Sequence, residues 1–405
     1  MMTQQNLTIA FILPMPLDPI VGGVQRTTWQ LGHYFAQQGW EVLFISLALD
    51  GHKVPLAGSL HFPSEVINGD SRLLKRFLAS TFRNHPPDVV INNTDLLSVS
   101  DNVLFELRQT GFSYRIVSCF RNNPFLFKDN HRSLVRHLLR NKRWVLFFID
   151  HPLGWMALLL WHRLKNRYMF SKVLSLCDRY LLLSPTFISE LRWFVPDLDE
   201  SKIIIIPNAF QMPDIRFLKP KCKRFLFVGR LQQAQKNILI LPNIWKKVQH
   251  RLPEWELHIV GDGPDRSELE SKIGQLSLER VQLHGQMNST EHYSVAKIFL
   301  MLSFFEGFGN TLIEAQMHGV VPVAFRSYSA VEWMLNDGID AMLVPPFDVD
   351  RYADALVQLA TDEDKWTCMS AAALSNAQRF SEKAVGDIWL KVLSEVMHEP
   401  LESAK

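Results

Sequence analysis

One stretch decides the fold of this chain: Ser303-Phe304-Phe305-Glu306-Gly307-Phe308-Gly309-Asn310-Thr311-Leu312-Ile313-Glu314-Ala315-Gln316-Met317-His318-Gly319. The apolar residues 298–302 before it predict a buried strand, and Gly307 and Gly309 permit a tight loop after that strand. A helix is predicted from Asn310, and Gly319 is a typical C-terminal stop for it. The stretch therefore predicts a strand, a glycine loop and a helix, the unit from which parallel sheets covered by helices are built.

Two carboxylates flank the predicted start of this helix, Glu306 in the loop and Glu314 about one turn into the helix. Backbone N–H groups at a helix start favour an anion, but carboxylates repel phosphate and accept hydrogen bonds from hydroxyl groups. A ligand with an anionic centre and hydroxyl groups on both sides fits this arrangement. A nucleotide sugar is such a ligand, with ribose at one end and a hexose at the other.

Length and composition predict two globular domains without a disulfide framework. The chain has 405 residues, and this length is more than one hydrophobic core usually supports. Of these residues 47% are hydrophobic, as is typical of globular domains. A formal net charge of +2 gives no indication of nucleic acid. The N-terminus lacks a signal-peptide pattern, so a reducing cytoplasm is favoured. The four cysteines are far apart and form no CxxC pair, which favours neither disulfides nor a zinc site: Cys119, Cys177, Cys222 and Cys368.

Short apolar runs alternate with amphipathic segments of helix length along both halves, so we predict an α/β fold of two Rossmann-like parallel-sheet domains. A proline-containing segment at 207–220 is the predicted linker. The predicted domains are residues 1–212 and 213–385, followed by a helical tail at 386–405. Because ligands of such sheets bind outside the carboxyl ends of strands, the site is expected in a cleft between the domains. The predicted strands are 7–13, 41–47, 88–91, 114–119 and 179–183, then 224–228, 255–260, 281–283, 298–302 and 320–325.

Further glycine loops follow other predicted strands. Gly22 and Gly23 end the first loop and would let the backbone approach a ligand, although a plain tight turn is the alternative. A complete GxGxxG is absent there, which disfavours a dehydrogenase. Gly261, in Gly261-Asp262-Gly263-Pro264, lies in another strand-to-helix turn near the expected ligand.

Two cations follow the strand at 224–228. Arg230 comes directly after Phe227-Val228-Gly229, and Lys236 lies in the next loop. An arginine can bind phosphate with two hydrogen bonds and a lysine adds a point charge, so the pair suits a diphosphate. Ordinary solvated side chains are the alternative interpretation.

Residues 121–172 carry many cations and little acid, around the apolar, aromatic segment 144–161. Asp150, Pro152 and Gly154 interrupt that segment, which disfavours a transmembrane helix. A basic amphipathic surface that lies on anionic lipid is favoured, and buried helices with a solvated basic face are the alternative. The cations are Arg121, Lys128, Arg132, Arg136, Arg140, Lys142, Arg143, Arg163, Lys165, Arg167 and Lys172.

In this order, the motifs resemble the family 4 retaining glycosyltransferases of the GT-B fold, of the kind that builds bacterial polysaccharide and lipopolysaccharide. The resemblance covers nearly the full length, and the segment from Glu306 to Glu314 is its most specific part. It implies two Rossmann-like domains that face a cleft and a C-terminal helix that returns to the first domain. The supporting motifs are Gly22-Gly23, Pro207-Asn208, Gly229-Arg230-Leu231 with Lys236, Gly261-Asp262-Gly263-Pro264 and Glu306 to Glu314.

The resemblance also implies roles. Arg230 and Lys236 would neutralise the donor diphosphate, Glu306 would bind the donor sugar, and Glu314 would bind the ribose. Neither a metal nor a cofactor is implied, since cations and the helix start stabilise the departing diphosphate, which would help to deprotonate the acceptor hydroxyl. The remaining residues implied in donor binding are Gly22, Gly23, Gly261, Phe308, Gly309, Asn310 and Thr311.

The chain departs from the family pattern after the strand at 114–119. Arg121 stands where many relatives carry a histidine, so it is a candidate catalytic residue that could contact the donor or the phosphate of an acceptor. Membership of the basic face is the alternative. His151 could substitute for the missing histidine, but a structural role is favoured for it.

Three acidic motifs look like the metal-binding DxD signature of the other glycosyltransferase fold. None of them ends an apolar strand, so helix starts and polar loops explain them better. The motifs are Asp197-Leu198-Asp199, Asp348-Val349-Asp350 and Asp362-Glu363-Asp364.

These expectations combine into a cytoplasmic enzyme at the inner face of the cell membrane. It would transfer a sugar from a nucleotide diphosphate sugar to a polysaccharide or lipid-linked glycan, with neither metal nor nucleic acid as partner. A nucleotide-sugar epimerase of the same fold is one alternative. A silent scaffold that binds sugar or lipid is the other.

Overall fold

The structure is a computed structural model that describes residues 6–15, 17, 23–47, 60–61, 69–94, 96, 98–126, 151–214 and 219–398. Gly22 and the cations from Lys128 to Arg143 lie outside the described residues. The chain forms two compact units. The first contains described residues up to Pro124, His151–Gln211 and the C-terminal residues from Glu382, and the second contains Met212–Ser381.

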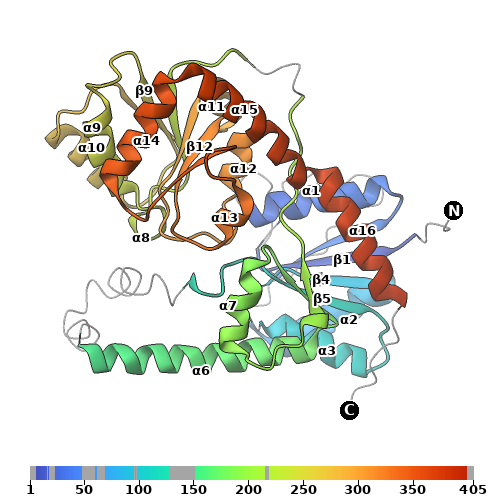
Figure 1. The fold of residues 1–405 in the computed structure, drawn as a ribbon. Helices are drawn as coiled ribbons and strands as arrows, with labels where there is room; N and C mark the ends of the chain where they lie inside the picture. Colours follow the sequence, from blue (N-terminus) through green and yellow to red (C-terminus); the bar gives the residue numbers. More distant parts are fainter. Residues whose placement is uncertain are drawn as a thin grey trace. The chain divides into compact units, whose positions relative to one another are not determined.

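The first unit is built on a parallel sheet of seven strands in the order β3-β2-β1-β4-β5-β6-β7 (Figure 1). Each apolar run predicted in this half forms a strand, and β1 lies inside the sheet between β2 and β4, with its residues almost fully buried. The order, apart from the added β7, is that of a doubly wound dinucleotide-type sheet. The strands are β1 (Thr8–Leu13), β2 (Glu41–Ser46), β3 (Leu60–His61), β4 (Val89–Asn92), β5 (Arg115–Phe120), β6 (Arg179–Leu182) and β7 (Ile203–Ile205).

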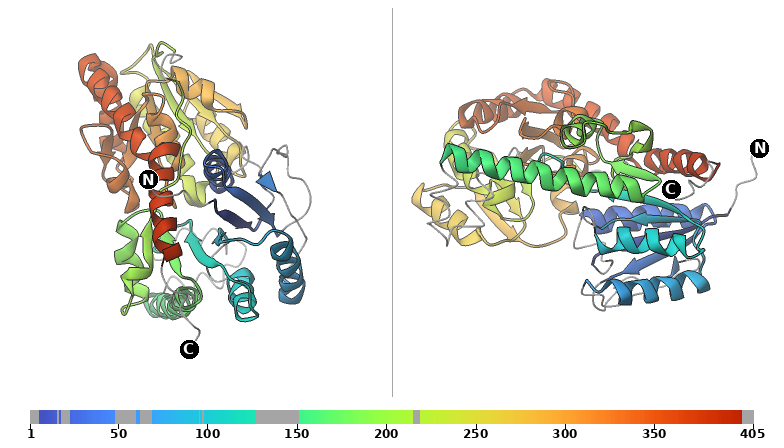
Figure 2. Two further views of the ribbon diagram at one scale, coloured as in Figure 1. Left: turned by 90° about the vertical axis from the view of Figure 1, so that its right-hand side faces the viewer. Right: turned by 90° about the horizontal axis from the view of Figure 1, so that it is seen from below.

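Helices connect these strands. The longest of those described in this unit is α6, a single straight helix of 25 residues (Figure 2). Asp70 begins α2 by accepting hydrogen bonds from two backbone N–H groups, and Ser98 with Asp101 forms a capping box at the start of α3. The helices are α1 (Gly23–Gln37), α2 (Ser71–Asn84), α3 (Val99–Gln109), α6 (Pro152–Leu176), α7 (Thr186–Phe194) and the 3-10 helix η1 (Glu200–Lys202).

The C-terminal helix α16 (Glu382–His398) belongs to the first unit, although the second unit precedes it in sequence. Trp389 is buried and its ring meets that of Phe35 on α1 edge to face, with the centroids 6.2 Å apart. Tyr34 donates a hydrogen bond of 2.9 Å to Asp387, and Gly386 leaves room for the Tyr34 ring. The predicted return of a terminal helix to the first domain is thus confirmed.

The second unit contains a parallel sheet of six strands in the order β10-β9-β8-β11-β12-β13 (Figure 1). It repeats the doubly wound order of the first sheet, so the predicted fold class is confirmed. The strands are β8 (Arg224–Val228), β9 (Glu256–Val260), β10 (Val281–Gly285), β11 (Ile298–Met301), β12 (Val321–Phe325) and β13 (Met342–Val344).

One apolar core joins this sheet to its helices, with Trp245 and Tyr352 among the largest buried side chains. Asp348 begins α14 by accepting a backbone hydrogen bond, as predicted for a helix-start carboxylate. Asp362 was predicted to lie in a polar loop, but it begins α15 in the same way. The helices are α8 (Gln233–Lys236), α9 (Leu241–Val248), α10 (Arg266–Gln275), α11 (Thr290–Val295), α12 (Asn310–Gln316), α13 (Ala330–Met334), α14 (Val349–Thr361) and α15 (Glu363–Ala377), with the 3-10 helices η3 (Ile238–Ile240) and η4 (Gln378–Phe380).

Three edge strands, β3, β7 and β13, were not predicted from the sequence. They have two or three residues each, too few for a periodic pattern to appear. The helix α12 is also shorter than predicted, because it ends at Gln316 and a turn leads to Gly319 at φ 69°.

Candidate functional site

The site begins where β8 ends. Arg230 is exposed there, and Lys236 lies three residues into the short helix α8. Two backbone hydrogen bonds tie this segment to the turn after β9, from Gly229 N–H to the Val260 carbonyl and from Leu231 N–H to the Asp262 carbonyl. The carboxyl ends of two neighbouring parallel strands therefore support the two predicted cations.

Gly261 makes this contact possible. Its φ is 139°, and a Cβ at this position would lie 1.9 Å from the Gly229 carbonyl oxygen. Its N–H donates to the Gly285 carbonyl at 2.8 Å. Gly261 is therefore required by backbone packing between the loops, which agrees with its prediction as a turn glycine.

Lys236 and Glu306 form a buried ion pair, with Nζ and Oε1 2.6 Å apart and side chains 15% and 8% exposed. Ser303 donates to the same carboxylate oxygen at 2.6 Å, and Gln235 donates to the other at 3.4 Å. The backbone N–H of Phe304 donates to the Gln235 carbonyl, which holds the loop after β11 against α8. A buried carboxylate with these partners has a fixed position and can accept hydrogen bonds from a ligand hydroxyl.

The start of α12 lies beside this pair. Gly309 is its N-cap residue at φ 95°, and a Cβ there would lie 2.6 Å from the Tyr328 hydroxyl. Burial and the nearby charge of Glu306 raise the pKa of Tyr328 well above its usual range, so the hydroxyl keeps its proton. Among the described residues this hydroxyl has no hydrogen-bond partner. The buried hydroxyl lies against Gly309 and so packs on the glycine loop from the inside.

The residues after Glu306 contribute in different ways. The Phe308 side chain is buried, and its ring packs edge to face on those of Trp333 and Phe380. Phe308 therefore fixes the backbone of the loop from the inside. Asn310 and Thr311 are half-buried at the first turn of α12. The predicted backbone contacts of these residues to a donor remain a prediction.

Glu314 is half-buried on α12, and its Oε2 accepts a hydrogen bond of 3.2 Å from the Tyr293 hydroxyl. The rings of Tyr293 and His318 stack with centroids 5.7 Å apart, and burial lowers the pKa of His318. Lys221 donates to the Tyr293 and Ser294 carbonyls, and burial lowers its pKa to about 7. Glu314 is thus oriented by an aromatic side chain and keeps part of its carboxylate accessible.

Arg121 belongs to the first unit and lies directly after β5. Its Nε donates to Asn93 at 3.0 Å and its Nη1 to Asn208 at 3.1 Å. Asn93 in turn donates to Thr28 of α1 at 3.2 Å. The network joins residues after β4, β5 and β7 to α1, so Arg121 is a fixed cation at the carboxyl ends of the first sheet. Gly23, the other described candidate of this unit, is the first residue of α1.

His151 is the N-cap residue of α6, and its Nδ1 accepts a hydrogen bond from the Leu153 N–H at 3.3 Å. This is the structural role that the sequence favoured for it. Asp199 likewise accepts hydrogen bonds from the Ser201 N–H and hydroxyl. The acidic motif at 197–199 therefore supports a turn.

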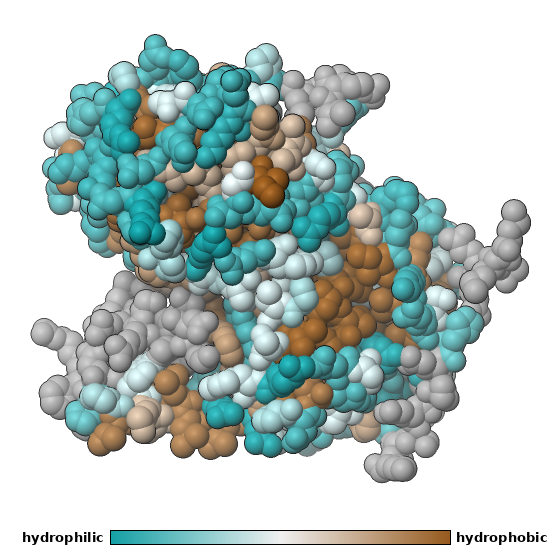
Figure 3. All heavy atoms as spheres, viewed as in Figure 1, coloured by the Kyte–Doolittle hydropathy of each residue, from teal (hydrophilic) through white to brown (hydrophobic). Residues whose placement is uncertain are grey.

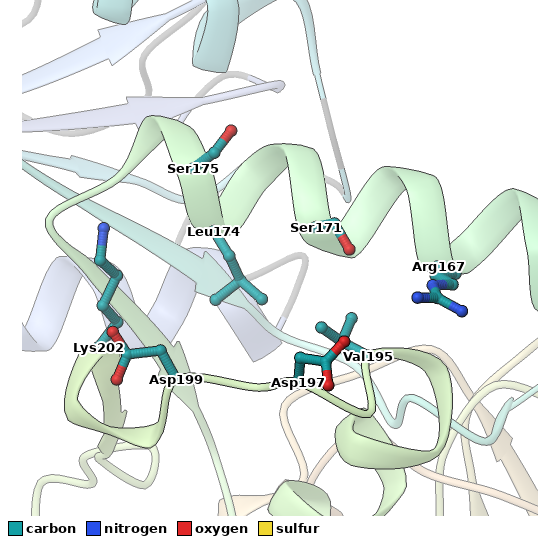
Figure 4. A pocket seen from close by; sticks show the side chains of 8 residues that line it. All are labelled: Arg167, Ser171, Leu174, Ser175, Val195, Asp197, Asp199 and Lys202. Carbon is teal, nitrogen blue, oxygen red and sulfur yellow. The ribbon is translucent and has the colours of Figure 1, made fainter. Parts of the chain in front are cut away.

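A pocket of about 330 Å³ lies between α6 and the loop after α7, and Figure 4 shows its side chains. It contains two carboxylates and two cations but none of the predicted site residues. Its lining residues are Arg167, Ser171, Leu174, Ser175, Val195, Asp197, Asp199 and Lys202.

The helix α6 has a row of exposed apolar side chains, which we call the α6 stripe. Five of the residues recur at intervals of three or four, and Trp161 follows Leu160 directly. All six therefore share one face of the helix, opposite the buried Trp155, Phe170 and Val173. Figure 3 shows hydrophobic side chains on the exposed side of this helix. Of the helices that the structure describes, none is both long and apolar enough to cross a membrane. The stripe consists of Leu153, Met156, Leu160, Trp161, Leu164 and Tyr168, each between 56% and 67% exposed.

Several residues of the site were not found from the sequence. Ser303 and Gln235 bind the Glu306 carboxylate, Tyr293 binds Glu314, and Tyr328 faces Gly309. Ser303 could have been suspected from its place after the strand. The others reach the site from separate elements, which no local pattern reveals.

The fold, with its loops at the ends of β8, β9 and β11, can be compared with those of known proteins. The fold is the two-domain GT-B arrangement, as in solved glycosyltransferase structures. One of them, an Anabaena protein in complex with UDP and glucose, has a TM-score of 0.71 and 17% identity, covering 96% of this chain and 100% of that one. At this identity the likeness concerns the fold alone.

The sequence comparison is more specific for the second unit. Residues 222–362 match the family "Glycosyl transferases group 1", and this segment contains Arg230, Lys236, Glu306 and Glu314. The chain is similar to a lipopolysaccharide 1,6-galactosyltransferase of Salmonella typhimurium, with 30% identity over 35% of this chain and 41% of the relative.

A second relative is a Campylobacter jejuni enzyme named as an N-acetylgalactosaminyltransferase that acts on a glycan linked to undecaprenol. It is 27% identical over 42% of this chain and 48% of the relative. The chain spans less than half the length of the curated relatives it matches.

Proposed function

We propose that this protein is a retaining glycosyltransferase of family 4, which transfers a sugar from a nucleotide diphosphate sugar to a polysaccharide or lipid-linked glycan. The observation that carries the proposal is the buried Lys236–Glu306 pair at the ends of β8 and β11, within the segment that matches group 1 glycosyl transferases. The pair sets a cation and a hydroxyl acceptor side by side. A nucleotide sugar carries a phosphate and sugar hydroxyls on neighbouring parts of one molecule.

In this proposal Arg230 and Lys236 bind the diphosphate and stabilise the charge that develops on it as the sugar leaves. Glu306, held by Lys236 and Ser303, accepts hydrogen bonds from donor sugar hydroxyls. These groups are positioned before reaction, which lowers the reorganisation needed in the transition state.

Transfer is proposed to proceed with retention, with the departing diphosphate accepting the acceptor proton on the same face of the sugar. The cations supply the charge stabilisation, so no divalent metal is required for this step. Uridine diphosphate sugars are the first donors to examine, because UDP occupies the structural relative from Anabaena. Arg121 is proposed to bind an anionic group of donor or acceptor from the first unit.

The direct test is transfer by purified protein, followed by mass spectrometry of a lipid-linked acceptor, with and without chelator. Product that retains the anomeric configuration and forms equally in chelator supports the proposal. Strict dependence on an added divalent ion, or inversion, contradicts the mechanism. Incubation of the donor alone distinguishes an epimerase, which would give a new sugar isomer without acceptor.

Replacing Glu314 by Ala is expected to weaken the binding of a nucleoside diphosphate by roughly 10- to 100-fold, since a hydrogen bond to a charged group contributes about 1.5–3 kcal/mol. Calorimetry with UDP and 2′-deoxy-UDP measures this. Wild-type protein should prefer UDP, and the variant should bind both alike. If the wild type and the variant preferred UDP over 2′-deoxy-UDP to the same extent, Glu314 would have no role in binding the ribose. The matched control is Glu268→Ala, which removes an exposed carboxylate from α10.

The lipid-linked acceptor places the protein at a membrane, and we propose that the α6 stripe lies on the inner face of the cell membrane. Arg163 lies at one edge of the stripe, and Lys165 and Lys172 lie at the other, as follows from the helical period. An apolar row between cations is the pattern of a helix that lies in the interface of an anionic bilayer. Loose binding of this kind needs no spanning helix.

Replacing Leu160 and Leu164 together by Gln is expected to lower binding to vesicles that contain phosphatidylglycerol by on the order of 10-fold or more, because each buried leucine contributes about 1.5–3 kcal/mol. Both side chains are 57% exposed, so the fold should keep its melting temperature. Flotation measures the bound fraction. The double variant with Met at both positions is the apolar control and should still bind. Undiminished flotation of the Gln variant would refute the proposal.

A further inference from the structure

Three histidines of the second unit gather on one face of its sheet, away from the Lys236–Glu306 pair in sequence. They are His258 on β9, His284 on β10 and His292 on α11. Each can offer a ring nitrogen such that the three nitrogens lie within 4.8 Å of one another. His258 is buried, and the other two are half-buried and reachable from solvent.

The fold explains why they meet. Gln282 pairs with His258 in the parallel register of β10 and β9, and the register shifts between Leu283 and Gly285, so His284 lies at the irregularity. The rings of His258 and His284 stack there, with their centroids 5.0 Å apart. The helix α11 covers this face and contributes His292, whose ring centroid lies 4.3 Å from that of His284. Three separate elements of the fold thus bring their histidines to one point. Histidines scattered over a surface by chance would not be expected to meet in this way.

Hydrogen bonds fix the ring of His258. Its Nε2 lies 2.9 Å from Glu256 Oε2 and donates its hydrogen to that carboxylate. Its Nδ1 then carries a lone pair, and it lies 3.0 Å from His284 Nε2. A carboxylate that holds one ring nitrogen and directs the other inward is the usual outer partner of a metal-binding histidine.

We propose that His258 Nδ1, His284 Nε2 and a ring nitrogen of His292 bind one divalent transition-metal ion, zinc being the best fit, with water as fourth ligand. Bond lengths of about 2.0–2.1 Å in a tetrahedral site place ligand nitrogens roughly 3.3 Å apart, close to the spacing of His258 and His284. His292 needs a small side-chain rotation, which its half-buried position on α11 permits. Imidazole ligands suit zinc, copper and nickel.

Neighbouring charges are compatible with a cation. Arg224 is the nearest positive group, and its Nε lies 3.4 Å from the Glu256 carboxylate, which offsets its charge. Burial lowers the pKa of all three histidines. Glu291 adds a negative charge beside His292.

The ion would join α11 to β9 and β10, and it shares no residue with the proposed donor site. Its expected effect is therefore on the stability of the second unit, while glycosyl transfer proceeds in chelator. The metal-site proposal and the proposed enzymatic function are therefore tested separately. An experiment that refutes one of them leaves the other standing.

The test uses the full chain, freed of metal with chelator and then titrated with Zn²⁺ and Co²⁺. We expect one ion per chain, a Zn²⁺-dependent rise in Tm, and the visible absorption of Co²⁺ bound to nitrogen and oxygen. In His292→Gln the affinity should fall at least about tenfold while the metal-free Tm stays unchanged. His250→Gln, which changes an exposed histidine of the same unit, should bind as the wild type does.

Three results would overturn the site. They are equal affinity in wild type and His292→Gln, no change of Tm with Zn²⁺, or a thiolate charge-transfer band with Co²⁺. The last would assign binding to the exposed Cys222 or Cys368. Should His292→Gln misfold, His284→Gln gives the same comparison from a different element.

Discussion

Glu306→Gln is expected to reduce the rate of glycosyl transfer by about 10²–10³, the loss typical for removal of one preorganised polar group from an active site. Glutamine keeps the shape of the side chain and can still accept from Ser303. It removes the charge that orients Lys236 and halves the acceptor capacity facing the sugar. The loss should appear in kcat more than in KM, because the positive charges of Arg230 and Lys236 that attract the diphosphate are retained.

The same substitution leaves Lys236 buried without its counter-ion. Breaking a buried ion pair costs about 3–5 kcal/mol when one partner stays charged, so a lower Tm is expected as well. The double variant Lys236→Met/Glu306→Gln removes both charges and should regain most of that stability while remaining inactive. This comparison separates a role in the reaction from a role in folding.

The matched control is Glu363→Gln. Glu363 also binds a lysine, Lys297, with 2.6 Å between Nζ and each carboxylate oxygen, but lies on α15 away from the glycine loop. Its loss should leave transfer unchanged. Full activity of Glu306→Gln, measured at saturating donor and acceptor, would exclude Glu306 from the site.

Much of the fold follows from the sequence because buried parallel strands are continuous apolar runs. Residues 298–302 and 224–228 could be recognised as strands in this way, and the loops after them follow directly. The order of the strands then places those loops at one edge of the sheet. Short edge strands such as β7 are held by their neighbour, so the sequence contains no pattern for them.

The sequence predicts candidate residues for the site but not the contacts between them. Lys236 and Glu306 are 70 residues apart, and their hydrogen bond depends on the adjacency of β8 and β11. The three histidines depend on strand register and on α11 in the same way. Arg121 was assigned to a ligand or to a basic face, and the structure adds a third role, a network with Asn93 and Asn208.

Gly261→Ala is expected to destabilise the second unit by about 2–5 kcal/mol. A left-handed backbone costs a non-glycine residue roughly 1–2 kcal/mol, and forcing extra atoms into a packed region costs about 1–3 kcal/mol more. The added Cβ would lie 1.9 Å from the Gly229 carbonyl oxygen, and no flexible side chain stands between them to yield. Relief requires the turn after β9 to separate from the end of β8.

That separation would also disturb the proposed donor site, because Arg230 follows Gly229 and the Leu231 N–H is held by the Asp262 carbonyl. Thermal unfolding should show a Tm lower by roughly 10 °C, given about 2–4 °C per kcal/mol for a unit of this size. Gly274→Ala is the control, since a Cβ there meets nothing within 4 Å and alanine in helix α10 stabilises by about 0.5–1 kcal/mol. If Gly261→Ala kept its Tm, the two loops would not pack as described, and the place of Arg230 beside Lys236 would lose its structural support.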